Sequence, residues 1–230
     1  MTDKELSKEK PVKYVIIPVS TVGCGKTEIN ICLNKLLPGS KIVKNSDYSH
    51  SSSFYSACVH ALLLDGINVV ILNKNNHRSF HRSQVLSAFQ KALGDNYDIK
   101  YICLDYLSDT DQTSSNFKDI AKSSISRRSG KEGNISGNEY SDAKVASIID
   151  HFTKDFQKLD ISSETNESFD LVLKLKPFEP EYHNNLKKIS KELNETYPDL
   201  LPSIPDDKKL EELLKDIFTN TNKEDQKNTK

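Results

Sequence analysis

The stretch VKYVIIPVSTVGCGKT, residues 12–27, decides the fold of this chain. Its first half, VKYVIIPV, is apolar and rich in β-branched residues, which predicts a buried strand. Its second half follows the phosphate-binding signature G-x-x-x-x-G-K-[ST], except that Ser20 stands at the first glycine position. A helical pattern follows at residues 26–37 and ends at a Pro-Gly pair. This order of strand, loop and helix predicts a P-loop, and a chance turn is the alternative interpretation.

The residue types of this loop suit a phosphate group. Small residues let successive backbone N–H groups approach the β-phosphate, and the following helix directs its N-terminal N–H groups at the same anion. We expect Lys26 to reach the β- and γ-phosphates and the Thr27 hydroxyl to bind Mg²⁺. The predicted nucleotide-binding residues are Ser20, Thr21, Gly23, Cys24, Gly25, Lys26 and Thr27.

Apolar runs that predict strands alternate with amphipathic patterns that predict helices along the rest of the chain. Further strands are predicted at residues 41–44, 67–72, 98–104 and 169–175, and further helices at 52–64, 79–93, 143–159, 182–193 and 208–218. This alternation predicts an α/β fold of the P-loop NTPase type, with a mainly parallel sheet and helices on both faces.

The chain is long enough for one sizeable α/β domain. We assign residues 12–219 to this domain, residues 1–11 to a flexible N-terminus and residues 220–230 to a disordered tail. Residues 106–138 are rich in Ser, Asp, Gly, Lys and Arg, and they interrupt the alternation. A connection of that length is typical of a lid, so we expect a lid over about 106–138.

Composition limits the function classes. The net charge is −1, so any nucleic acid would have to be held by a local basic patch rather than by a global field. No apolar run is long enough for a membrane span, and residues 1–11 are charged and lack the apolar region of a signal peptide, so we expect no membrane partner. The four cysteines lack metal-ligand spacing, which is typical of reduced thiols in an intracellular protein, cytoplasmic or nuclear.

Asp47 is the candidate catalytic base. It follows the predicted strand 41–44, and the carboxyl ends of strands in an open parallel sheet face the ligand crevice. A kinase needs such a group to accept the proton of the acceptor hydroxyl. A cap for the helix that begins near residue 51 or 52, or a plain turn, are equally good interpretations of this aspartate.

Two further polar segments are candidates for the site. NKNNHR, residues 73–78, follows the third predicted strand; it either holds an acceptor phosphate or forms an ordinary asparagine-rich turn. Arg127 and Arg128 lie in the predicted lid, from which a guanidinium group would reach the γ-phosphate. A solvated basic loop is the alternative for this pair.

Together these segments resemble the kinase domain of fungal tRNA ligase, the GTP-dependent RNA 5′-hydroxyl kinase of tRNA splicing. The resemblance covers residues 13–202, and its most specific parts are T-x-G-C-G-K-T and N-N-H. The matching segments are TVGCGKT (21–27), KNSD (44–47), NKNNH (73–77) and RRSG (127–130). The family's patterns at these places are T-x-G-C-G-K-T, Q-N-D-N, D-R-N-N-H and the lid segment with a phosphate-contacting arginine.

The resemblance implies roles for the candidate residues. It implies that Lys26 clamps phosphate, Asp47 is the general base, and Arg127 or Arg128 stabilises the transition state. It implies an RNA-end pocket that includes Asn75, Asn76, His77 and Arg78. It also implies GTP as the donor, although the residues themselves leave GTP and ATP both open.

The chain departs from the family's pattern in several ways, and one is that SGKEG, residues 129–133, replaces the acidic and histidine residues after the family's lid arginine. Aligned without a gap, Ser46 stands at the base position, and a shift of one residue places Asp47 there. Asn73 and Lys74 replace the family's Asp-Arg pair, which removes a carboxylate and a bidentate phosphate donor. The family's ligase and phosphodiesterase domains have no counterpart in this sequence, so we expect a standalone, partly diverged kinase module.

Three functions fit these observations. The first is an enzyme: an Mg²⁺-dependent polynucleotide 5′-hydroxyl kinase that moves the γ-phosphate of GTP or ATP to a broken tRNA or RNA end. The second is a degenerate kinase that binds RNA ends or a protein partner, such as an immunity factor against an RNA-cleaving toxin. The third is a small-molecule P-loop kinase, for which the sequence shows no acceptor-specific motif.

Overall fold

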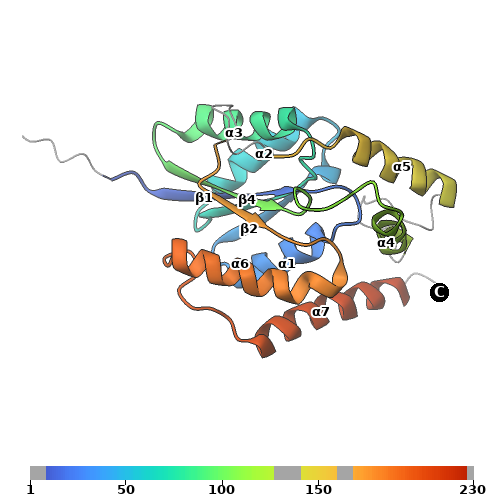
Figure 1. The fold of residues 1–230 in the computed structure, drawn as a ribbon. Helices are drawn as coiled ribbons and strands as arrows, with labels where there is room; N and C mark the ends of the chain where they lie inside the picture. The colour runs from blue at the N-terminus through green and yellow to red at the C-terminus, as the bar shows by residue number, and fades with distance from the viewer. Residues whose placement is uncertain (1–8, 127–140, 160–167, 227–230) are drawn as a thin grey trace, which may run out of the picture.

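The computed structural model describes residues 9–126, 141–159 and 168–226. Within these residues five parallel strands form one sheet in the order β2-β3-β1-β4-β5, with β1 in the centre (Figure 1). The strands are β1 (Val12–Val19), β2 (Ser40–Lys44), β3 (Val69–Asn73), β4 (Asp98–Asp105) and β5 (Leu171–Lys174). The strand order reverses beside β1, and open α/β sheets bind ligands outside the carboxyl ends of the strands at such a point.

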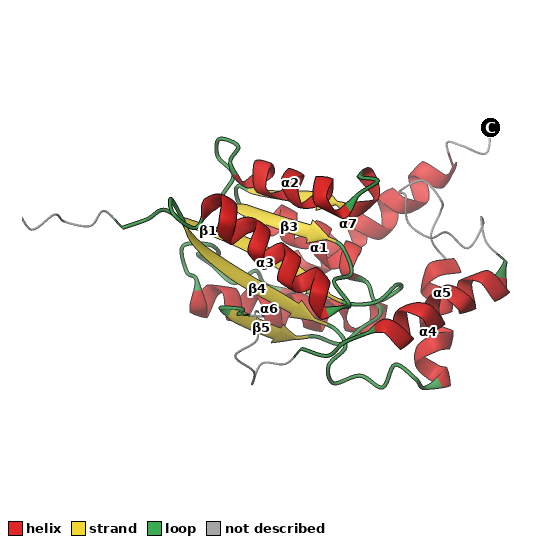
Figure 2. Cartoon of the chain, turned by 90° about the horizontal axis from the view of Figure 1, so that it is seen from above, coloured by secondary structure: helices red, strands yellow, loops and turns green. Residues whose placement is uncertain are grey.

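Helices cover both faces of the sheet, which confirms the predicted fold class. α2 and α3 lie on one face, and α1, α6 and α7 lie on the other (Figure 1). α4 and α5 lie beyond the carboxyl ends of the strands in both views (Figures 1 and 2). The helices are α1 (Lys26–Leu36), α2 (Ser51–Leu62), α3 (Ser79–Leu93), α4 (Ser115–Ser126), α5 (Asp142–Asp155), α6 (Tyr182–Thr196) and α7 (Asp207–Gln226).

The continuous apolar run of β1 is explained by burial on both sides of the sheet. Tyr14 and Ile16 belong to the core under α1, α6 and α7. Val15 and Ile17 belong to the core under α2 and α3. A strand with polar residues on one side would leave one of these helical layers without an apolar surface to pack on.

The segment 106–138, predicted as a long lid connection, contains a helix. α4 buries Phe117, Ala121 and Ile125, which are spaced four residues apart and form one apolar stripe. Serine and lysine residues between them make this stripe sparse, and for that reason the sequence pattern did not predict the helix. Whether the segment moves as a lid remains a prediction, and residues 127–140 lie outside the described part of the chain.

The ends of several elements differ from the predicted ones by one to a few residues. The largest difference is at α7, which continues to Gln226 rather than ending at residue 218. Residues 219–226 contain neither proline nor glycine, so nothing in their sequence stops the helix. Among the described helices none is both long and apolar enough to cross a membrane.

Candidate active site

The predicted P-loop connects β1 to α1 at the carboxyl edge of the sheet. Gly23 and Gly25 have φ angles of 81° and 86°, in the left-handed region that favours glycine. α1 begins directly after Gly25, and no side chain caps its first turn. The backbone N–H groups of that turn are therefore directed at the loop, as anion binding at a helix N-terminus requires.

Ser20, which replaces the first glycine of the signature, attaches the P-loop to the segment after β3. Its backbone N–H donates to the Asn75 carbonyl oxygen at 2.8 Å, and its hydroxyl donates to Asn75 Oδ1 at 3.3 Å. Ser20 is fully buried. The departure from glycine therefore has a structural explanation, because the hydroxyl group makes a contact that a glycine cannot make.

Three segments distant in sequence pack on the P-loop. A Cβ at Gly23 would come within 3.0 Å of the Ala121 carbonyl oxygen in α4. The Phe178 N–H donates to the Cys24 carbonyl oxygen at 3.2 Å, and Phe178 itself has a φ of 80°, which is strained for a phenylalanine. The Tyr182 ring, at the start of α6, lies against Gly25. Sequence reasoning missed these contacts, since no local pattern records which distant residue packs on a loop.

The substitution Gly25→Ala is expected to destabilise the fold by about 2–5 kcal/mol. The new methyl group would overlap the Tyr182 ring, and the φ of 86° is unfavourable for alanine. The ring cannot easily yield, because it stacks on Phe218 with a centroid distance of 6.4 Å. Urea denaturation, monitored by circular dichroism, measures the decrease in the free energy of unfolding.

Gly66→Ala is the matched control for this substitution. Gly66 also has a left-handed φ, of 72°, but a methyl group there meets nothing within 4 Å. Gly66→Ala should lower the free energy of unfolding by about 1–2 kcal/mol, which is the penalty for placing an alanine in the left-handed region. Equal losses for Gly25→Ala and Gly66→Ala would contradict the packing of Tyr182 on the loop.

Thr27 and Asn73 bring two side-chain oxygen atoms together beside the P-loop. The Thr27 hydroxyl donates to Asn73 Oδ1 at 3.3 Å, which joins the start of α1 to the end of β3. Mg²⁺ prefers oxygen ligands and keeps several waters, so one hydroxyl and one neighbouring oxygen from the protein suit it. These two residues therefore fit a nucleotide-bound Mg²⁺, with an amide oxygen where the resemblance leads us to expect a carboxylate.

Two residues of the segment 73–78, which the sequence predicts to belong to an RNA-end pocket, are buried in the structure. Asn76 is fully buried with a φ of 49°, and its amide donates to the Pro18 carbonyl oxygen at 3.0 Å. His77 is 7 % exposed, and its ring lies 4.6 Å from the Phe152 ring between centroids. Burial lowers the pKa of His77 to about 4, so the ring is neutral near pH 7. Asn76 and His77 are therefore buried and hold the loop, and their part in an RNA-end pocket stays a prediction.

Arg78 is the exposed member of the predicted pocket. Its side chain is 44 % exposed and forms an ion pair with Asp155 at the end of α5. The Arg78 guanidinium lowers the pKa of the Asp155 carboxyl group. Of the four predicted pocket residues, Asn75 contacts the P-loop, two are internal, and Arg78 alone presents a partly exposed charged group.

Arg82 and Asp105 were missed by sequence reasoning. Arg82 is fully buried and donates to the carbonyl oxygens of Asn76, at 3.2 Å, and Gln157, at 3.0 Å. Asp105 is 2 % exposed, and its Oδ1 accepts the N–H groups of the turn that follows β4. Charged residues are normally exposed. The sequence therefore does not predict that Arg82 and Asp105 are buried beside the site.

Asp47 lies in a short 3-10 turn, η1 (Asn45–Asp47), directly after β2 and at the same sheet edge as the P-loop. Its side chain is exposed, and its Oδ1 accepts a hydrogen bond from the Ser46 hydroxyl at 3.3 Å. The helix-cap interpretation is wrong, because His50 is the N-cap residue of α2 and no side chain caps that helix.

Lys74 fixes the position of the turn that carries Asp47. Its ammonium group donates to Asn45 Oδ1 and to Ser51 Oγ, both at 3.1 Å, and lies over the rings of Phe54 and Tyr55. Burial lowers the pKa of Lys74. The lysine that replaces the family's arginine therefore ties the end of β3 to the start of α2.

Arg127 and Arg128, the predicted lid arginines, lie outside the described residues. α4, which ends one residue before Arg127, packs on the P-loop through Ala121. In the described ranges no group of three or more His, Cys, Asp or Glu side chains is arranged to hold a metal ion.

The family model of the tRNA ligase kinase domain matches residues 15–178, which include the P-loop, η1 and the segment after β3. The chain belongs to the tRNA ligase kinase domain family. Among solved structures, a fungal RNA kinase superposes with a TM-score of 0.78 and 26 % identity, covering 90 % of this chain and 97 % of that one. The kinase-domain fold is thus shared over nearly the whole length of both proteins.

Two curated relatives of this kinase domain are tRNA ligases. The tRNA ligase of Candida albicans is 27 % identical over 217 residues, which is 90 % of this chain and 25 % of that protein. The tRNA ligase 1 of Schizosaccharomyces pombe is 24 % identical over 197 residues, which is 84 % of this chain and 24 % of that protein. The chain therefore spans about a quarter of the length of the curated relatives it matches.

Proposed function

We propose that this kinase domain is an Mg²⁺-dependent RNA 5′-hydroxyl kinase that transfers the γ-phosphate of GTP or ATP to the end of a broken tRNA. The observation that supports this most is the contact pattern of three consecutive residues. Asn73 contacts Thr27 and Asn75 contacts Ser20, both in the P-loop, while Lys74 contacts Asn45 in the turn of Asp47. One short segment thus fixes the phosphate-binding loop and the proposed base relative to each other.

The proposed transfer uses each part of this edge. The P-loop N–H groups and Lys26 hold the β- and γ-phosphates, and Asp47 accepts the proton of the RNA 5′-hydroxyl. The hydroxyl oxygen then bonds to the γ-phosphorus while the bond from that phosphorus to the bridging oxygen breaks, which leaves a nucleoside diphosphate. When bound through Thr27 and Asn73, Mg²⁺ supplies positive charge to the phosphates. Arg127 or Arg128 is the proposed lid cation.

The proposed acceptor follows from the relatives. They are named tRNA ligases and an RNA kinase, so an RNA end is the acceptor class best supported. This proposal also assigns the protein to the cytoplasm or the nucleus, where tRNA is present, and it requires no membrane.

The proposal is tested by following labelled γ-phosphate from GTP, and separately from ATP, into an RNA oligonucleotide with a 5′-hydroxyl end. Transfer should require Mg²⁺ and should show which nucleotide is the better donor. Binding of nucleotide and RNA without any transfer would refute the kinase and would support the degenerate binding module instead.

The substitution Asn73→Asp is expected to lower the Mg²⁺ concentration for half-maximal transfer by about tenfold. The new carboxylate would lie beside the Thr27 hydroxyl, where Asn73 Oδ1 lies now at 3.3 Å, and would add negative charge at the metal position. Initial rates over a series of Mg²⁺ concentrations measure the change. The control is Asn34→Asp, which adds the same charge on the exposed part of α1 far from the P-loop. It should not change the Mg²⁺ concentration for half-maximal transfer. If Asn73→Asp left this Mg²⁺ concentration unchanged, the result would contradict a role for Asn73 in binding the metal.

A further inference from the structure

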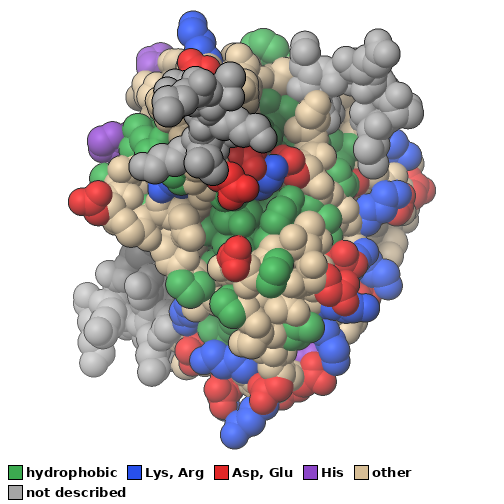
Figure 3. Space-filling model, turned by 90° about the vertical axis from the view of Figure 1, so that its left-hand side faces the viewer, with side chains coloured by type: hydrophobic (Ala, Val, Ile, Leu, Met, Phe, Trp, Pro, Cys, Tyr) green, Lys and Arg blue, Asp and Glu red, His purple; other side chains and the backbone are tan. Residues whose placement is uncertain are grey.

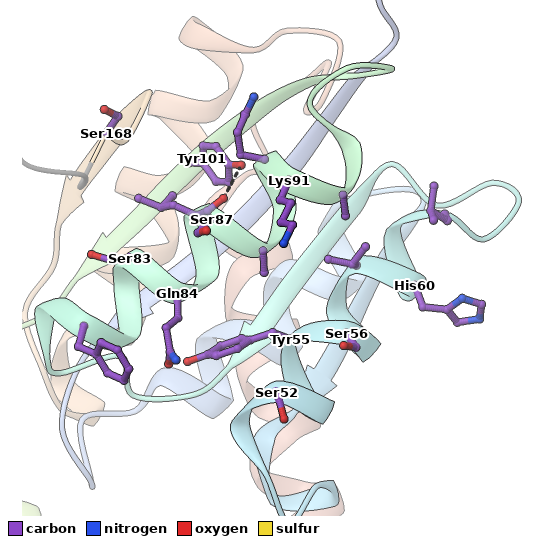
Figure 4. A pocket seen from close by; sticks show the side chains of 17 residues that line it. Ser52, Tyr55, Ser56, His60, Ser83, Gln84, Ser87, Lys91, Tyr101 and Ser168 are labelled. Atoms are coloured by element: carbon purple, nitrogen blue, oxygen red, sulfur yellow. Dashed lines mark hydrogen bonds between the residues drawn. The ribbon is translucent and has the colours of Figure 1, made fainter.

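A groove lies between α2 and α3, on the outer side of the layer that covers β1 and β3. It is part of a hollow of about 1360 Å³ that extends over α3: α2 and α3 line the groove itself, and Tyr101 of β4 and Ser168 line the part on the other side of α3 (Figure 4). Pockets that enclose small molecules usually measure about 300–1,000 Å³. The size therefore suits a segment of a chain better than one small ligand.

The groove carries hydrogen-bonding groups along both walls. Figure 4 shows Ser52 and Ser56 on α2, and Ser83 and Ser87 on α3, along its length. Hydroxyl groups of this kind donate hydrogen bonds to phosphate and sugar oxygens. A purely apolar protein segment would leave these groups without partners.

Tyr55 supplies a buried hydroxyl group in this groove. The residue is 5 % exposed, and its hydroxyl has no hydrogen-bond partner among the described residues. Figure 4 shows its side chain pointing toward that of Gln84 on the opposite wall. Burial raises the pKa of Tyr55 to about 12, so the group is a neutral donor at physiological pH. An unsatisfied buried donor is costly, and an acceptor lying in the groove would satisfy it.

The charge of this layer favours a polyanion. None of the described residues that line the groove is acidic. Residues 48–93 include a single carboxylate, Asp65, in a chain with 33 acidic residues, and the groove itself contains Lys91 and His60. On the end of the molecule seen in Figure 3, by contrast, Asp and Glu side chains lie on both the upper and the lower part, and Lys and Arg side chains are numerous on the lower part.

Phe80 stands at the end of the groove nearest the active site. It is the second residue of α3, two positions after Arg78, and it is 65 % exposed. Exposed aromatic rings are the surfaces on which unpaired bases stack. From Phe80 to Lys91 the helix measures about 17 Å at 1.5 Å per residue, which matches about five stacked nucleotides.

We infer that the groove between α2 and α3 binds the single-stranded RNA that follows the 5′-terminal nucleotide, with a base on Phe80 and a phosphate near Lys91. This inference rests on the proposed RNA kinase function. The hydroxyl donors bind phosphate and sugar, and the absence of carboxylates avoids repulsion. The groove explains how a protein of net charge −1 holds a polyanion.

The test measures the affinity of the full chain for fluorescein-labelled 5′-hydroxyl oligouridylates of two to twelve nucleotides by fluorescence anisotropy. Affinity should rise with length and reach a plateau near six to eight nucleotides. Phe80→Ala and Lys91→Glu should each raise the Kd for the longest RNA by about tenfold. The control for Phe80→Ala is Ile204→Ala, which changes an apolar residue that is 48 % exposed. The control for Lys91→Glu is Lys191→Glu on α6. Neither control should change the Kd.

The outcomes separate this inference from the proposed function. Phosphate transfer by the wild type, with wild-type RNA affinity in both groove variants, would overturn the groove and leave the kinase intact. Groove-dependent RNA binding without transfer to any 5′-hydroxyl RNA would support the groove and refute the kinase. A dimer that Phe80→Ala dissociates, together with RNA affinity independent of length, would assign the groove to a second copy and overturn the inference.

Discussion

Replacing Lys26 by alanine is expected to lower kcat for phosphate transfer by about 10²–10³-fold. Lys26 is the first residue of α1, immediately after the left-handed Gly25, so its side chain leaves the helix at the point where the P-loop N–H groups converge. Removing the ammonium group takes away positive charge next to the phosphoryl group that is transferred. Single-turnover kinetics with saturating nucleotide measure the loss.

Lys35→Ala is the matched control for this prediction. Lys35 lies on the last turn of the same helix and pairs with Asp216 at 3.5 Å near the surface. Such exposed pairs contribute about 0.2–1 kcal/mol to stability, and this one is remote from the P-loop, so transfer should be unchanged. Wild-type kcat in Lys26→Ala would mean that the P-loop does not serve the reaction.

The substitution Asp47→Ala is expected to lower kcat by about 10²–10⁴-fold, because the 5′-hydroxyl loses its proton acceptor. The turn should persist without the carboxylate, since Lys74 holds Asn45 at 3.1 Å. Nucleotide affinity should therefore stay close to that of the wild type. The comparison of kcat with the nucleotide Kd tests this directly.

Ser46→Ala decides between the two residues at the base position. Ser46 donates a hydrogen bond to Asp47 Oδ1 at 3.3 Å, and losing this one neutral donor should change kcat by less than about tenfold. Asp65→Ala, which removes an exposed carboxylate at the opposite edge of the sheet, should leave kcat unchanged. A large loss in Ser46→Ala with little loss in Asp47→Ala would place the catalytic role one residue earlier.

The sheet was predictable because its signal is local. The β1 strand and the P-loop lie at the residues that the apolar run and the signature predict, and the alternation of elements predicts the parallel sheet. α4 was not predictable in the same way. Its Phe117, Ala121 and Ile125 become a recognisable apolar stripe only through the core that they contact.

The residues of the site were predictable in place but not in orientation. Asp47 and the segment 73–78 lie at the predicted edge of the sheet. The sequence does not show that Asn76 turns toward the Pro18 carbonyl oxygen or that His77 packs on Phe152, because both depend on segments far apart in the chain. The packing of Tyr182 on Gly25 is hidden for the same reason.

The most direct test of the central claim is the position of the label after reaction of the wild-type chain with labelled GTP, Mg²⁺ and an RNA oligonucleotide. Two acceptors of one sequence are compared, one with a 5′-hydroxyl and one with a 5′-phosphate. We predict that only the first becomes labelled, and that complete digestion recovers the label on its 5′-terminal nucleotide. Label on both acceptors, or on neither while nucleotide remains bound, would contradict a 5′-hydroxyl kinase.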